Sequence, residues 1–201
     1  MNISCQNIIN LERPMQGIMD LKRAGFERIL LGISANLPKL DLLKEKNAPK
    51  IIGERYEWFI GKCRENTIHI SAVSVPNIPY KTAVEKNYAG FLRKCALECI
   101  RLCSKAGCGY VVIPSLLAEH GKAWDVNREF YLMLAETAKE HSVHILLKNQ
   151  CEEIGGRLVR GNCAEPFQAA EWIDRLNGEM RGEKHLWLLC QFQQGSGVLP
   201  G

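Results

Sequence analysis

Short apolar runs alternate with longer amphipathic segments along most of this chain. The runs are rich in Ile, Leu and Val, which is typical of strands that are buried on both faces. The segments between them repeat apolar residues at helical spacing. This alternation predicts an α/β fold in which helices join the strands of a parallel sheet.

Six strands and five helices are predicted in this way. The strands cover 2–9, 28–33, 67–75, 110–113, 144–147 and 186–190, and the helices cover 14–25, 53–66, 86–105, 125–141 and 165–176. Pro14 suits a first helical position, Gly25 suits a left-handed C-terminal cap, and Asp125 can cap the helix it precedes. The segment 34–52 is expected to be a loop with one helical turn.

Length and composition point to one compact domain, 1–201. The chain has 201 residues, 46% of them hydrophobic and 24% charged, as in ordinary globular proteins. A closed (β/α)₈ barrel typically needs ~200 to 400 residues and eight strands. About six strands in a chain of this length fall short of the eight strands of such a barrel.

Charge and hydropathy narrow the class of protein further. The net charge of +4 is spread along the chain, and no signal peptide or membrane-spanning run is visible. We therefore expect a cytoplasmic protein that binds neither membrane nor nucleic acid. The tryptophans are expected to be core or packing residues rather than a stacking platform, because no basic groove accompanies them: Trp58, Trp124, Trp172 and Trp187.

The nine cysteines are expected to be buried thiols without a disulfide framework. Cys95, Cys99 and Cys103 share one face of a predicted helix, and Cys108 follows them. Their thiolates could bind a soft metal ion. The missing Cys-x-x-Cys pair favours an apolar stripe of the core instead.

Four segments follow one another in a recognisable order: LKRAGFERILL (21–31), ISAVSVPNIPY (70–80), CSKAGCGYVVIP (103–114) and LAETAKEHSVHILLKNQ (134–150). In this order they resemble the sugar phosphate isomerase/epimerase family of xylose isomerase-like TIM barrels, a group that also includes enzymes of the endonuclease IV type. The resemblance covers nearly the whole chain as the first six barrel units. It implies that two further units would lie beyond Gly201.

The resemblance also implies a divalent metal site at the carboxyl ends of the strands, built from carboxylates and histidine. Lys148 stands where the family has a metal-binding glutamate that also transfers a proton. Gln191 and Gln194 stand where the family has an aspartate and a histidine. An ammonium ion has no lone pair to offer, so no cofactor is expected. Mn, Mg, Co or Zn would bind only if the site is retained in altered form.

The candidate site residues follow from these positions. Lys148 could be a catalytic amine with a lowered pKa, or a lysine that pairs with an acidic neighbour. His120, with Glu119 beside it, is a second catalytic candidate, or part of a residual polar pocket. The remaining candidate ligand-binding residues are Asn149, Gln191, Gln194 and Arg157.

Arg157 belongs to a glycine-rich basic segment, 155–162, that follows the fifth predicted strand. It is expected to be a flexible loop that either clamps a phosphate or remains solvated. His141 and His144 precede that strand, at the end away from the expected site, and are expected to be surface or capping residues.

These features favour a sugar isomerase/epimerase-like protein whose own metal-dependent activity is lost or impaired, and which binds a sugar-like ligand or a protein partner. One alternative is an active isomerase with a non-standard or subunit-shared site. Another is a DNA-repair protein, which would need clustered zinc ligands and a basic groove. The open edges of an incomplete sheet predict self-association, or a tail that covers an edge.

Overall fold

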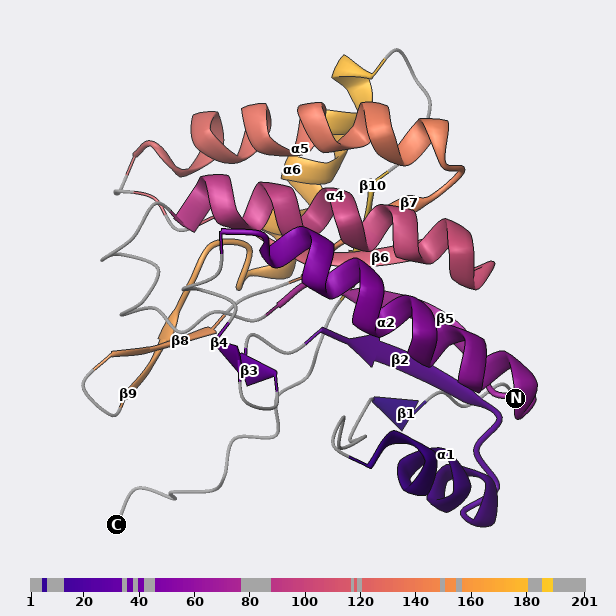
Figure 1. Ribbon diagram of the computed structural model, residues 1–201. Coiled ribbons are helices and arrows are strands. Elements are labelled where there is room, and N and C mark those ends of the chain that lie inside the picture. The colour runs from indigo at the N-terminus through magenta and orange to yellow at the C-terminus, as the bar shows by residue number, and fades with distance from the viewer. Residues whose placement is uncertain are drawn as a thin grey trace, which may run out of the picture.

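A six-stranded parallel sheet forms the centre of the protein (Figure 1). The computed structural model describes residues 5–6, 13–33, 36–37, 40–41, 46–76, 88–116, 118, 121–148, 151–154, 157–180 and 186–189. The strands of the sheet, in spatial order, are β1 (Cys5–Gln6), β2 (Arg28–Gly32), β5 (His69–Ser74), β6 (Tyr110–Pro114), β7 (His144–Lys148) and β10 (Leu186–Leu189). Spatial order follows chain order, as it does in a TIM barrel.

Helices connect these strands and form a layer over the sheet. They are α1 (Pro14–Arg23), α2 (Ala48–Glu65), α4 (Tyr88–Ala106), α5 (Ala123–Glu140) and α6 (Pro166–Glu179). Helices α2, α4 and α5 lie side by side in chain order (Figure 1), and α6 contacts α5. Within the described part of the chain, no helix is long and apolar enough to cross a membrane.

Burial alternates along β2 and β7, because one face of the sheet packs against the helices. Ile29, Leu31, Ile145 and Leu147 are fully buried and belong to the main hydrophobic core. Their neighbours along β2 and β7 are only half-buried. The sheet therefore has a helix-covered face and a second face, which corresponds to the interior of a barrel.

Four helices end in the same hydrogen-bonded turn, the Schellman motif. In α4, the amide N of Cys108 lies 3.0 Å from the carbonyl O of Cys103, and the amide N of Gly107 lies 3.1 Å from the carbonyl O of Ser104. Equivalent bonds end α1, α2 and α5. The turn requires one left-handed residue, and these are Gly25, Thr67, Gly107 and Ser142, with φ of 78°, 58°, 70° and 54°.

This turn also brings together two side chains five positions apart, which normally make an apolar contact. The pairs at the four helix ends are Leu21 and Phe26, Cys63 and Ile68, Cys103 and Cys108, and Ala138 and Val143. A sheet strand begins one or two residues after each turn. The turn therefore fixes where each strand enters the sheet.

Two short antiparallel hairpins complete the described structure. One pairs β3 (Asn36–Leu37) with β4 (Leu40–Asp41), and the other pairs β8 (Cys151–Ile154) with β9 (Arg157–Arg160). The first follows β2 and the second follows β7, so both lie at the carboxyl end of the sheet (Figure 1).

The α/β fold and its six strands are confirmed, but three local predictions are wrong. Helix α2 begins at Ala48 rather than at residue 53; Pro49 lies in its first turn, where the missing N–H of proline costs nothing. Asp125 does not cap α5. It lies in the first turn of this helix, where its negative charge interacts favourably with the positive end of the helix dipole. Within the basic segment, residues 157–160 are not a loop, because they form strand β9.

The side-chain predictions have a mixed outcome. Six cysteines are buried free thiols, as expected: Cys63, Cys95, Cys99, Cys103, Cys108 and Cys163. Trp124 and Trp172 pack edge to face at 5.6 Å, but Trp58 is 50% exposed, so its core assignment is wrong. His141 caps α5. His144 does not lie on the surface: it is half-buried, and the centroid of its ring lies 5.8 Å from that of the Tyr110 ring.

Two glycines test whether the turn that ends α4 requires a left-handed residue. Gly107 has a positive φ at that turn, whereas Gly61 has a helical conformation inside α2. We expect Gly107→Ala to lower the free energy of unfolding by about 1 kcal/mol, because alanine is strained at φ 70°. Gly61→Ala, inside α2, should raise it by roughly 0.5–1 kcal/mol, because alanine favours the helix. No heavy atom lies within 4 Å of a Cβ at either site, so steric clash does not intervene.

Chemical denaturation of the two variants beside the wild type measures both changes. Equal effects of the two substitutions would show that the left-handed residue at the end of α4 is not a constraint.

Candidate functional site

The carboxyl ends of the central strands lie next to one another, and in TIM barrels this end carries the active site. The strand register pairs Gly32 of β2 with Ser74 of β5, and Pro114 of β6 with Lys148 of β7. Lys148 also pairs with Leu189 of β10. It therefore lies at the end of an interior strand, between two neighbours.

Lys148 is half-buried, and burial lowers the pKa of its amine. Along β7 it alternates with Leu147, which is fully buried under the helices. Lys148 thus belongs to the opposite face of the sheet. On that face the register aligns Leu146 of β7 with Val112 of β6, so the amine stands above an apolar layer.

The described strand ends do not fit a divalent metal ion. Carboxylates and imidazoles are the side chains that hold Mn²⁺ or Mg²⁺ in proteins. The strand ends supply neither group, since they are Gly32, Ser74, Pro114 and Lys148. Among the described residues, no group of three or more His, Cys, Asp and Glu could hold a metal ion. We therefore derive no chemical step through a metal.

Buried asparagines hold the turn after β6 in place. Asn127 of α5 is fully buried; its side-chain O accepts a hydrogen bond from the Leu116 amide at 2.6 Å, and its side-chain N donates to the Leu116 carbonyl at 3.0 Å. Asn162 also donates to the Leu116 carbonyl, at 2.8 Å. The segment after β6 is therefore fixed at the edge of the candidate site.

Asn127 was not predicted from the sequence, although a signal existed. It occupies the same helical stripe as Phe130, Tyr131 and Leu134, all of which are buried. An amide in an apolar stripe needs hydrogen-bond partners, and a backbone turn is the usual source.

The sequence-predicted site residues are only partly placed. Lys148 lies at the expected strand end. Arg157 opens β9, opposite Ile154, and its side chain is outside the described part. Five candidates lie outside the described residues: Glu119, His120, Asn149, Gln191 and Gln194. Their roles therefore remain predictions.

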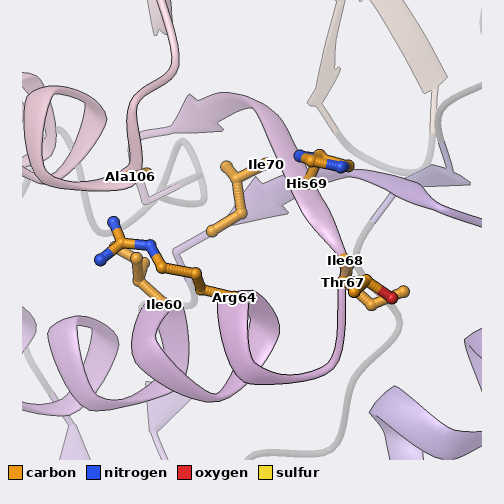
Figure 2. A pocket seen from close by; sticks show the side chains of 7 residues that line it. All are labelled: Ile60, Arg64, Thr67, Ile68, His69, Ile70 and Ala106. Atoms are coloured by element: carbon orange, nitrogen blue, oxygen red, sulfur yellow. The ribbon is translucent and has the colours of Figure 1, made fainter.

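A cavity of about 170 Å³ lies at the other end of the sheet (Figure 2). It is lined by Ile60, Arg64, Thr67, Ile68, His69, Ile70 and Ala106. The Arg64 guanidinium extends along it toward the end of α4 (Figure 2) and donates a hydrogen bond of 2.8 Å to the Lys105 carbonyl. This is the amino end of β5, the end of a barrel that contributes to stability rather than catalysis.

Solved structures with this fold include sugar epimerases. An L-ribulose 3-epimerase matches 94% of this chain with a TM-score of 0.57 and 16% identity, and a D-tagatose 3-epimerase-like protein matches 94% with a TM-score of 0.63 and 13% identity. A xylose isomerase-like TIM barrel protein from Mycobacterium smegmatis, solved in complex with magnesium, matches 89% with a TM-score of 0.57 and 15% identity.

The chain spans 59%, 64% and 56% of the length of these three proteins. No protein-family model and no curated protein matches the sequence. The chain therefore has the fold of the xylose isomerase-like TIM barrels, over part of their length.

The asparagine bonds predict a graded loss of stability. Asn127→Ala should lower the free energy of unfolding by roughly 2–3 kcal/mol, because it removes several hydrogen bonds and leaves the Leu116 amide buried without its partner. Asn162→Ala should cost only about 1 kcal/mol, since it removes a single partly buried bond. Urea unfolding of both variants measures the difference, and a larger loss for Asn162→Ala would contradict this account.

The burial of Lys148 predicts a pH-dependent stability. The pKa of Lys148 is lower in the folded than in the unfolded state. At pH values between the pKa of the folded state and about 10.5, the unfolded chain therefore binds more protons than the folded chain. Wild-type stability should therefore rise with pH through this window. Lys148→Met should be more stable than the wild type at pH 7, because it removes the cost of desolvating the ammonium ion.

The advantage of Lys148→Met should shrink as the pH approaches 10.5, and the difference between the two unfolding curves at each pH tests this. If the difference in free energy of unfolding between the variant and the wild type did not change with pH, Lys148 would not be desolvated.

Proposed function

We propose that this protein binds a sugar-like ligand at the carboxyl ends of its strands and that its metal-dependent isomerase activity is lost or impaired. The observation that carries the proposal is the position of Lys148. A half-buried ammonium ion occupies the end of an interior strand, in the region where barrel enzymes bind their substrates. The names of the similar structures support sugars as the class of ligand.

An ammonium group suits such a ligand. It offers three hydrogen-bond donors, which can reach sugar hydroxyls or a phosphate group. It has no lone pair while protonated and repels a divalent cation. The two neighbouring strand ends, Pro114 of β6 and Leu189 of β10, add no negative charge. The site therefore favours binding of a neutral or anionic ligand over metal-assisted proton transfer.

Titration with D-tagatose, L-ribulose and their phosphate esters tests the proposal, with and without Mn²⁺. We expect binding that does not depend on the metal and no epimerisation of the sugar. Lys148→Met should weaken binding about tenfold or more, because a hydrogen bond to a charged group contributes ~1.5–3 kcal/mol.

Lys105→Met is the matched control. Lys105 is an exposed lysine near the end of α4, paired with Glu57 at 2.5 Å, and lies at the opposite end of the sheet. Its loss should leave the affinity unchanged. Stoichiometric binding of Mn²⁺ together with sugar epimerisation would overturn the proposal in favour of an active isomerase.

A second candidate function is catalysis by the Lys148 amine. The lowered pKa favours it, since a larger neutral fraction of the amine can attack a sugar carbonyl and form a Schiff base. Borohydride reduction in the presence of each ketose would then add the sugar to the peptide that carries Lys148. Binding without such an adduct supports the first proposal.

We further propose that the outer strands of the sheet mediate self-association. In the described structure, β1 pairs only with β2 and β10 pairs only with β7, and an open edge presents backbone groups to a partner strand. Sedimentation velocity tests this proposal, and a monomer at all concentrations would contradict it. The cytoplasmic location and the absence of nucleic-acid binding remain predictions.

A further inference from the structure

The turn that ends α4 carries two cysteines at the positions that the Schellman motif brings into contact. Cys103 is the residue whose carbonyl accepts the closing hydrogen bond, and Cys108 donates it, at 3.0 Å. The other three helix ends with this turn place at least one non-thiol residue in the pair. Among these four helix ends, that of α4 alone joins two thiols.

The two sulfur atoms face the same point of the backbone. The Cys103 sulfur lies 3.2 Å from the carbonyl O of Tyr110, and the Cys108 sulfur lies 4.0 Å from that atom. Both thiols therefore approach the same carbonyl oxygen, which places them beside each other. Cys103 is fully buried and Cys108 is 8% exposed, so a small molecule reaches Cys108 first.

The two thiols differ in acidity. The hydrogen bond from Cys103 lowers the pKa of Cys108, against the opposing effect of burial. Burial raises the pKa of Cys103 well above its usual value, and the hydrogen bond to Cys108 adds to this. Burial also raises the pKa of three other described cysteines, Cys63, Cys95 and Cys163, to about 12.

We propose that Cys103 and Cys108 form a redox-active dithiol that a hydroperoxide converts to a disulfide. The Cys108 thiolate attacks the peroxide oxygen, which gives a sulfenic acid and releases an alcohol or water after proton transfer. The Cys103 thiol then attacks the Cys108 sulfur, and water leaves. The two thiols lose two hydrogens, and the peroxide is reduced by two electrons.

This pair lies at the amino end of the sheet strands, since β6 begins at Tyr110, and Lys148 ends β7 at the other end. The dithiol therefore functions independently of the ligand site proposed above, and failure of either proposal leaves the other standing. A disulfide between Cys103 and Cys108 would cross-link the turn that joins α4 to β6 and hold it in its present conformation.

Peptide mapping tests the proposal on the wild-type protein. Trypsin cuts after Lys105, between the two cysteines, so a disulfide joins the peptides Leu102–Lys105 and Ala106–Lys122. After treatment with hydrogen peroxide and alkylation, we expect this linked pair, with a mass about 2 Da below the sum of the two free peptides. It should disappear when dithiothreitol is added before digestion.

Cys95 and Cys99 supply the internal control, because they lie on the same helix, are fully buried and share the peptide Cys95–Arg101. The Cys103–Cys108 link should exceed any disulfide of these two by at least about tenfold, because thiolate reacts and thiol does not. Complete alkylation of Cys103 and Cys108 after peroxide, or equal linkage to Cys99, would overturn the proposal.

Two variants assign the roles within the pair. Cys103→Ser should leave a sulfenic acid at Cys108 that dimedone traps, whereas Cys108→Ser should reduce peroxide consumption at this site to background. Circular dichroism confirms that each variant is folded before treatment. Dimedone labelling of Cys103 in folded Cys108→Ser, as strong as that of Cys108 in Cys103→Ser, would contradict the assignment.

Discussion

The left-handed turn at the helix ends determines how this chain is built. It closes α1, α2, α4 and α5 with the same pair of backbone hydrogen bonds and directs the chain into the next strand within two residues. Because the turn also joins two side chains, each helix end is packed against the start of the strand that follows it. The parallel register of the sheet follows from repetition of this joint.

Much of this architecture could be predicted, because hydrophobic periodicity marks both strands and helices. Gly25 could be identified as a left-handed residue, since glycine adopts positive φ without strain. Thr67 and Ser142 could not, because their side chains give no sign of a conformation that they adopt only when the surrounding structure requires it. Trp58 was misplaced since an aromatic residue near a buried stripe can still point outward.

The candidate site was predicted only in outline. The position of Lys148 could be located because this residue ends an apolar strand. The turn around Leu116 could not be predicted, because it depends on Asn127 and Asn162 from two segments distant in sequence. Nor could strand β9, because its two arginines are flanked by glycines in the sequence, a composition that resembles a solvated loop; in the structure this strand pairs with β8.

The sequential order of the strands has a consequence for biosynthesis. Each new strand of the sheet adds to the one made just before it, from β1 through β10, so no pairing waits for a segment synthesised much later. Each pairing closes one helical crossover, and the entropic cost of closing such a loop grows only slowly with its length. The protein can therefore acquire its structure progressively while it leaves the ribosome, one strand and helix at a time.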